Sequence, residues 1–131
     1  MSKIKLVKFP LKVDQRGKLT FFETGKNILI PIKRVFAVSI PLKKKRGNHA
    51  HKKCTQIIIC VQGKIKVVFD NGIVKKNYYL RTMSQGLIIP PKKWIVIYGL
   101  SKNSNFIVLC DKVFDKKEYI LNYNEYLKII K

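Results

Sequence analysis

The two histidines of this chain, His49 and His51, stand two residues apart. On a β-strand, side chains at positions i and i+2 face the same side, so both imidazoles point into one place, either a barrel interior or the solvent. An imidazole has a reference pKa near 6.5 and can take up and return a proton near neutral pH. We therefore predict a proton-transfer site, and favour it over the alternative of two buried structural histidines.

Short β-strands are the elements that must hold this pair. Seven runs rich in Ile, Val, Phe and Tyr are separated by turn signals, and they cover residues 35–40, 55–61, 64–69, 73–80, 86–89, 94–98 and 105–110. Asp70-Asn71-Gly72 is the strongest hairpin signal, because Asn-Gly supplies the positive φ angles of a tight turn. This succession predicts an antiparallel sandwich or barrel.

The tail of the chain has a helical pattern. Its apolar positions recur at spacings of three and four: Ile120, Tyr123, Leu127 and Ile130. Asp115 and Glu118 have the spacing of a capping box. We therefore expect a helical segment that begins near Asp115 and covers one end of the barrel.

Length and charge limit the classes of function. A chain of 131 residues with 47% hydrophobic residues has room for one domain, so we take residues 1–131 as a single domain. The 28 Lys and Arg against 7 Asp and Glu leave a net charge of +21, a balance typical of nucleic-acid or membrane-surface binders. Only four of these residues are Arg, and the lysines are spread along the chain without interleaved aromatics. We interpret the charge as surface composition, with no nucleic acid and no membrane as partner.

Cysteine usage and the N-terminal segment indicate a cytoplasmic protein. Cys54, Cys60 and Cys110 are an odd number without CxxC spacing, so we expect reduced, buried thiols rather than disulfides, a zinc ribbon or nucleophiles. The first ten residues lack the apolar region of a secretory signal, and no apolar run reaches the length that spans a bilayer.

The spacing after the histidines resembles the first motif of the cupin superfamily, in which His-x-His is followed by a Glu and then a Gly. Gln56 stands at the Glu position and Gly63 at the Gly position. A second cupin motif falls at residues 90–95, where Ile95 occupies the His position. The resemblance implies an all-β jelly-roll barrel of antiparallel strands with a short C-terminal helical segment. Two imidazoles without an anionic or third nitrogen ligand make a weak metal site, so we expect no metal and no cofactor.

Among cupins, the chain resembles the metal-independent sugar 3,4-ketoisomerases. The resemblance covers nearly the whole chain, through DQRG at 14–17, IKRVF at 32–36, RGNHAHKK at 46–53 and the tail with Tyr119 and Tyr123. It implies an isomerase that moves the keto group of a deoxythymidine-diphosphate sugar, dTDP-4-keto-6-deoxy-D-glucose, from C4 to C3.

This reaction removes the proton at C3, passes through an enediolate and delivers a proton to C4. By resemblance, His49 is the principal base, and His51 shuttles the proton or stabilises the enediolate. Arg46 places a cation on the pyrophosphate or on the developing oxyanion. Arg16 and Arg34 match family positions near the substrate, and a salt bridge to one of the few acids is the alternative role for Arg34.

Two departures from the family concern the product. The family often has an aromatic hydroxyl at the place of Ala37 and a His at the place of Ile95. The product is a 3-keto-6-deoxyhexose of galacto or gluco configuration, and we favour galacto because the surroundings of Arg16 resemble that branch. Such a product is a precursor of 3-amino-3,6-dideoxysugars in surface glycans such as the O-antigen of lipopolysaccharide.

Three alternatives compete with the isomerase. They are a dTDP-sugar 3,5-epimerase of the same fold, a non-catalytic cupin that binds a sugar nucleotide, and a nucleic-acid binder with steeply salt-dependent affinity. Small cupins generally pair through their sheets, and this family often exchanges N-terminal strands. We therefore expect a homodimer in which the alternating segment 3–9 is an edge strand or a swapped strand.

Overall fold

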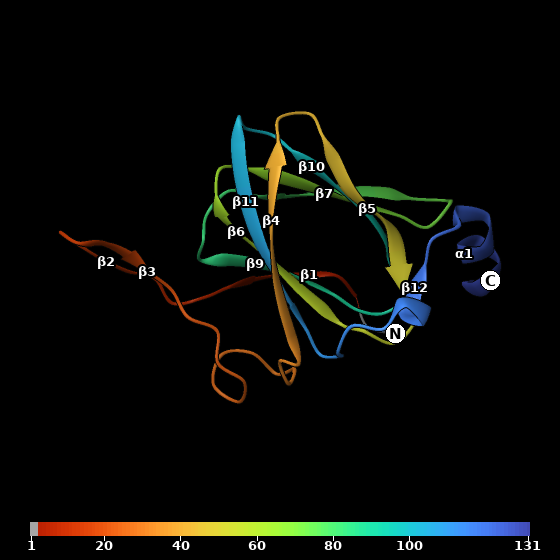
Figure 1. Cartoon of the computed structure of the whole chain (residues 1–131), viewed down its shortest axis with the longest axis horizontal. Coiled ribbons are helices and arrows are strands. Elements are labelled where there is room, and N and C mark those ends of the chain that lie inside the picture. Colours follow the sequence, from red (N-terminus) through yellow and green to blue (C-terminus); the bar gives the residue numbers. More distant parts are fainter. Residues whose placement is uncertain (1–2) are drawn as a thin grey trace.

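The computed structural model describes residues 3–131, and its strands form two five-stranded antiparallel sheets that face each other (Figure 1). The order of the first sheet is β1 (Lys5–Lys8), β9 (Gln85–Ile89), β6 (Gln56–Gln62), β11 (Asn103–Cys110) and β4 (Arg34–Pro41). The order of the second is β12 (Tyr119–Ile120), β5 (Lys45–His51), β10 (Trp94–Gly99), β7 (Ile65–Asp70) and β8 (Lys75–Leu80). This arrangement confirms the expected jelly-roll barrel.

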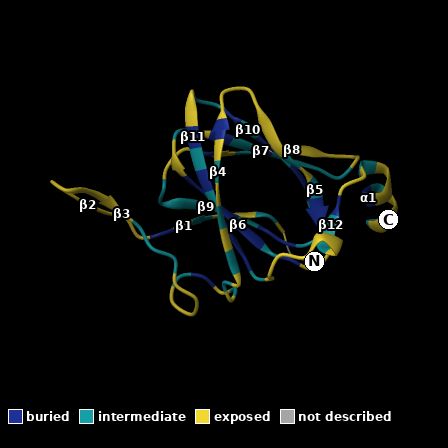
Figure 2. Cartoon of the chain, viewed as in Figure 1, coloured by how far each residue is buried: buried dark blue, intermediate teal, exposed yellow. Residues whose placement is uncertain are grey.

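A two-stranded hairpin of β2 (Lys12–Asp14) and β3 (Gly17–Leu19) stands apart from both sheets. It projects from the barrel on the side opposite to the C-terminal helix (Figure 1). All six residues of its strands are exposed (Figure 2). Neither strand belongs to the seven runs predicted from the sequence, because three polar-rich residues carry no alternating signal.

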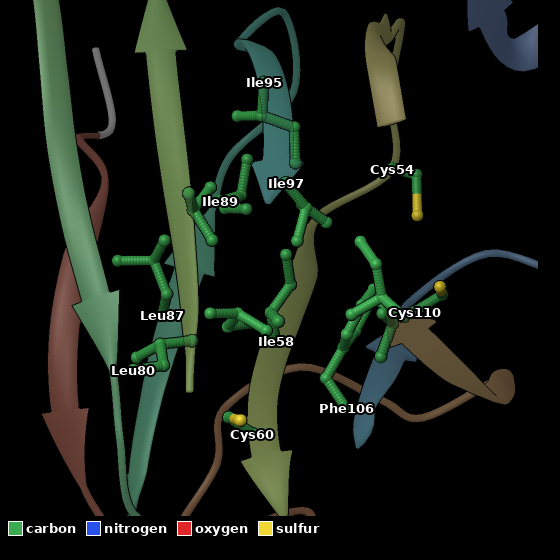
Figure 3. Close-up of a cluster of buried hydrophobic side chains, with 14 residues drawn as sticks. Cys54, Ile58, Cys60, Leu80, Leu87, Ile89, Ile95, Ile97, Phe106 and Cys110 are labelled. Atoms are coloured by element: carbon green, nitrogen blue, oxygen red, sulfur yellow. The ribbon is translucent and has the colours of Figure 1, made fainter. Parts of the chain in front are cut away.

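The core fills the space between the sheets and extends behind the first one. Side chains of β6 are buried on both faces: Ile58 and Cys60 pack between the sheets, whereas Ile57 and Ile59 pack outward against Phe9. This double burial is the reason that β6 reads as an unbroken apolar run rather than an alternating one. The cysteines are free and buried, as expected, and Figure 3 shows Cys54 and Cys110 at one edge of the inner cluster.

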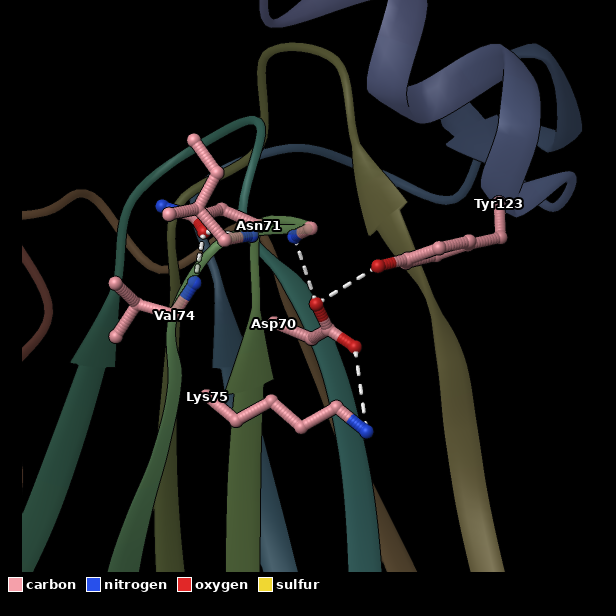
Figure 4. Close-up of polar contacts among 7 residues, drawn as sticks. Asp70, Asn71, Val74, Lys75 and Tyr123 are labelled. Atoms are coloured by element: carbon pink, nitrogen blue, oxygen red, sulfur yellow. Dashed lines mark hydrogen bonds and ion pairs between the residues drawn. The ribbon is translucent and has the colours of Figure 1, made fainter.

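The turn between β7 and β8 forms where the Asp-Asn-Gly signal predicts it. Gly72 has a φ of +87°, and its N–H donates to Asp70 Oδ1 at 2.8 Å. The Asn71 side chain accepts hydrogen bonds from the N–H groups of Ile73 and Val74 (Figure 4). These bonds keep Ile73 and Val74 in the turn, so β8 begins two residues later than the predicted run.

The tail corrects the predicted start of the helix. Asp115 caps only the 3₁₀ turn η1 (Lys116–Glu118), and α1 (Tyr123–Ile129) begins after a second cap at Asn122. The Glu118 side chain does not complete a capping box, because Glu118 Oε1 accepts the N–H groups of Lys53 and Cys54 at 2.5 and 2.6 Å. Among residues 3–131, no helix is long and apolar enough to cross a membrane.

The helix α1 packs against the outer face of the second sheet, not across the end of the barrel as the sequence predicted. Tyr126 is buried against Trp94, Ala50 and Ile120, on the outer face of the second sheet. The Tyr123 hydroxyl donates to Asp70 Oδ1 at 2.8 Å, which ties the helix to the β7–β8 turn (Figure 4). The helix therefore supports the strands β5 and β12 from behind.

Candidate active site

A cavity of about 410 Å³ lies between the two sheets and holds most of the chemical groups predicted from the sequence. Its wall combines apolar residues of both sheets with four side chains that can bind anions or exchange protons: Arg34, Arg46, His49 and Tyr119. A larger hollow of about 680 Å³ lies on the outer face of the first sheet, where the charged lining residues are Lys3 and Lys5. The smaller cavity is therefore the candidate site, because only it combines basic and proton-exchanging groups.

A β-bulge in β5 brings Arg46 and His49 onto one face. His49 is opposite Ile95 and Gly47 is opposite Val96, so Asn48 is an extra residue without a partner on β10. Gly47 and Asn48 have φ angles of +81° and +61°. In a regular strand, side chains three residues apart point to opposite faces. The extra residue of the bulge lets the side chains of both Arg46 and His49 face the cavity.

The histidine pair lies where the His-x-His spacing predicts it. The ring centroids of His49 and His51 are 5.0 Å apart, and Ala50 between them faces α1. His49 lines the cavity, whereas His51 is buried behind it with 7% of its surface exposed. Neither ring nitrogen of His51 has a hydrogen-bond partner among the described residues, which is rare for buried polar groups and typical of functional sites.

Burial keeps both imidazoles neutral at pH 7. It lowers the pKa of His49, and a hydrogen bond to the Gly47 backbone opposes this effect. Burial, the charge that His49 carries when it is protonated, and the positive charge of Arg34 together lower the pKa of His51 to about 4. A neutral imidazole carries a lone pair on one of its ring nitrogens, which is what a general base needs.

Arg34 is held by aromatic rings and a phenol. Its guanidinium lies 4.5 Å from the ring centroid of Phe36 and 4.9 Å from that of Phe114. Arg34 Nη1 donates to the Tyr119 hydroxyl at 3.2 Å. The salt bridges among residues 3–131 do not include Arg34.

Tyr119 is a site residue that sequence reasoning did not assign. It lies directly opposite His51 across the β12–β5 pair. Its ring centroid is 5.1 Å from that of His49 and 4.5 Å from that of His51. The sequence signal was its place among the residues that carry the ketoisomerase resemblance, in a tail where a helical pattern was expected instead of a strand.

The positions that differ from the cupin motifs and from the family all line the cavity. Ile95 lines the cavity opposite His49, and buried Gln56 donates from Nε2 to Cys110 Sγ at 3.5 Å. Ala37 touches the cavity but is exposed on β4, whose inward position is taken by Phe36. Within residues 3–131, no three His, Cys, Asp or Glu side chains lie close enough to hold a metal ion.

Arg16 is not brought to the cavity of its own chain. It lies in the turn of the β2–β3 hairpin and pairs with Asp14, with Arg16 Nη2 2.6 Å from Asp14 Oδ2. The side chain of Arg16 is 90% exposed. The predicted role of Arg16 therefore requires another chain.

A two-sheet jelly roll with a histidine pair inside the barrel defines a cupin-type protein. The family model described as "FdtA: WxcM-like, C-terminal" matches residues 2–131. The chain belongs to this family. Several solved structures that it resembles are sugar 3,4-ketoisomerases.

Three relatives match almost the full chain. A TDP-4-oxo-6-deoxy-α-D-glucose-3,4-oxoisomerase of Aneurinibacillus thermoaerophilus is 32% identical over 127 residues, which are 96% of this chain and 91% of that protein. The crystal structure of a 3,4-ketoisomerase from Helicobacter canadensis has a TM-score of 0.92 at 30% identity and covers 99% of this chain and 98% of its own. QdtA, a sugar 3,4-ketoisomerase from Thermoanaerobacterium thermosaccharolyticum solved with TDP, has a TM-score of 0.92 at 31% identity, with 96% and 93% covered.

Proposed function

We propose that this protein moves the keto group of TDP-4-keto-6-deoxy-D-glucose from C4 to C3. The observation that carries the proposal is the neutral His49 imidazole in the cavity wall, on the same face of β5 as the Arg46 cation. A base beside a fixed cation is what removal of the C3 proton next to a carbonyl requires. The full-length match to 3,4-ketoisomerases supports the same substrate class.

His49 is the base in this proposal. Its unprotonated ring nitrogen takes the C3 proton, and the electrons form an enediolate across C3 and C4. The imidazolium exchanges its proton with solvent and then protonates C4 on the same face. His51 stays neutral because its pKa is about 4. It packs edge-on against His49 and fixes the plane of that ring.

The two cavity arginines divide the anionic parts of the substrate. Arg46 is exposed at the cavity mouth, where it can contact the pyrophosphate. Arg34 is half-buried and held by Tyr119 and two aromatic rings, so its charge stabilises the oxyanion of the enediolate deeper in the cavity.

A deuterium experiment tests the reaction. The protein is treated with a chelator and incubated with TDP-4-keto-6-deoxyglucose in D₂O, and NMR follows the sugar. We expect a 3-keto product with deuterium at C4, and loss of turnover in His49→Gln but not in Lys52→Gln, whose residue is exposed on the loop after β5. Exchange at C3 and C5 with the ketone still at C4 identifies a 3,5-epimerase instead, and binding without exchange or product identifies a binding module.

The product is proposed to have galacto configuration. The support is the resemblance around Arg16, and the use of such a 3-keto sugar is amination at C3 for surface glycans. The coupling between H4 and H5 of the product made in H₂O decides the point: a small coupling fits an equatorial H4 and the galacto product, whereas a large coupling identifies the gluco product.

A homodimer would give Arg16 a role. The β2–β3 hairpin projects from the barrel with Arg16 exposed, and β1 forms the edge of the first sheet. The outer face of that sheet carries a largely apolar hollow. We infer that two chains pair through this face and that each hairpin delivers Arg16 to the partner's cavity.

Mixed subunits test this arrangement. Arg16→Ala and His49→Gln are each expected to be nearly inactive alone. After unfolding and refolding together, a heterodimer has one cavity with both His49 and a partner's Arg16, so about a quarter of the wild-type activity returns for random pairing. If no activity returns, Arg16 does not act in the partner's cavity. If the protein sediments as a monomer, the proposed dimer is rejected.

A further inference from the structure

Tyr119 is the only residue with a hydroxyl among the described residues that line the cavity. It comes from β12, where its register places it opposite His51. Its ring lies against both imidazoles, and its hydroxyl accepts a hydrogen bond from Arg34 Nη1 at 3.2 Å. A phenol in this position faces the same cavity as the base and is held beside a fixed cation.

The proposed reaction moves two protons, and the histidine base accounts for one of them. On the carbons, one proton is removed from C3 and one is delivered to C4. In the same conversion the hydroxyl proton at O3 is lost and O4 gains one. A group that serves the oxygens must donate a proton to O4 and accept one from O3, and a neutral phenol next to a cation can do both.

We propose that Tyr119 is a catalytic residue that relays this second proton between the substrate oxygens. This inference rests on the proposed function. As His49 takes the C3 proton, negative charge develops on O4 beside Arg34. The Tyr119 hydroxyl then gives its proton to O4, so the enediolate becomes a neutral enediol and Arg34 holds the phenolate. The phenolate then takes the proton of O3 as the C3 carbonyl forms, while the His49 imidazolium protonates C4. Both side chains return to their starting states, so no further reactant is needed.

The cavity offers few other groups for this relay. Phe36 occupies the inward position on β4 next to Arg34 but lacks a hydroxyl. The Gln56 amide is directed to Cys110. Tyr119 and Arg34 are thus the polar pair that can serve the substrate oxygens O3 and O4.

Tyr119→Phe is the first test, because it removes only the hydroxyl and keeps the ring contacts with His49 and His51. We expect kcat to fall about 100-fold or more, while thermal unfolding and affinity for TDP stay close to wild type. Tyr123→Phe is the matched control, since that hydroxyl bonds to Asp70 outside the cavity. A Tyr119→Phe variant within about threefold of the wild-type kcat overturns the proposal.

A second measurement separates proton transfer from packing. Incorporation of 3,5-difluorotyrosine at position 119 makes the phenol more acidic without removing it. We expect the basic limb of the kcat profile to move to lower pH, and to stay in place when the analogue is at position 123. A basic limb that does not move with the analogue at 119 also overturns the proposal. Absence of turnover in the wild-type protein would instead reject the proposed function.

Discussion

Arg46 and His49 face the same cavity although they are three residues apart on one strand. The unpaired residue Asn48 shifts the in-and-out alternation of side chains along β5 by one residue. The strand therefore presents a cation and a base on the same face. The cost is a backbone with two successive positive φ angles, at Gly47 and Asn48. Bulges of this kind re-aim side chains at functional sites, and here the bulge completes the candidate active site.

Gly47→Ala is predicted to impair both stability and turnover. A Cβ on Gly47 would lie 3.1 Å from the Ile95 carbonyl oxygen, and its φ of +81° disfavours any other residue. Gly25→Ala is the matched control, because Gly25 has a φ of +85° with nothing within 4 Å of the added Cβ. In urea unfolding we expect each variant to lose about 1–2 kcal/mol, with the larger loss for Gly47→Ala. Only Gly47→Ala should lose isomerase activity, and wild-type turnover in that variant would contradict the role of the bulge.

The stability of the protein is predicted to depend on His51 below pH 6.5. The unfolded chain protonates this residue near 6.5, whereas the folded pKa is about 4. Between these values only the unfolded state binds the proton, so the contribution of His51 is present above pH 6.5 and is lost as the pH falls toward 4. The gap between 6.5 and about 4 corresponds to about 3 kcal/mol.

His51→Phe keeps a ring and removes this titration. We expect the unfolding free energy of the variant, measured in urea between pH 7 and 4, to fall less steeply than that of the wild type. The remaining slope includes His49, whose pKa is also lowered by burial. Parallel curves for the two proteins would show that His51 is not buried in its neutral form.

Glu118 is predicted to anchor the loop between β5 and β6. Glu118 lies directly before β12, the strand that carries Tyr119. Its Oε1 accepts hydrogen bonds from the N–H groups of Lys53 and Cys54. Glu118→Ala leaves both donors without this acceptor, and we expect a loss of about 2 kcal/mol in urea unfolding. Glu118→Gln retains an amide oxygen in the same place and should lose much less. Equal losses in the two variants would indicate that the charge of Glu118 matters rather than its position as an acceptor.

The thiols are predicted to be inert in the folded protein. Cys54, Cys60 and Cys110 are all buried, with 1–4% of their surface exposed. Hydrogen bonding from Cys54 and Gln56 lowers the pKa of Cys110, yet a reagent must reach the sulfur to react. A colorimetric disulfide reagent should therefore modify the cysteines slowly in buffer and rapidly in urea. Fast modification of one thiol in the folded protein would show that the barrel opens near Cys110.

The sequence by itself determined seven of the strands and the shared face of the histidine pair. Alternation over two residues is a local property, so His49 and His51 had to share a face on any extended strand, and the apolar runs had to be buried. The Asp-Asn-Gly turn is local in the same sense, because Asn71 and Gly72 hold it with their own side chain and backbone. These features are confirmed in β5, in the core strands and in the β7–β8 connection.

Tertiary structure decided which other groups join the histidines. Arg46 reaches the cavity only because β10 pairs with β5 across a bulge, and Arg34 meets Tyr119 from 85 residues away. The capping box predicted for Asp115 and Glu118 does not form, because the Glu118 side chain accepts hydrogen bonds from the loop after β5 instead. Arg16, placed near the substrate by resemblance, lies on a hairpin outside its own barrel. Such contacts depend on strand pairing and on segments far apart in the chain. Neither can be predicted from the spacing of residues along the sequence.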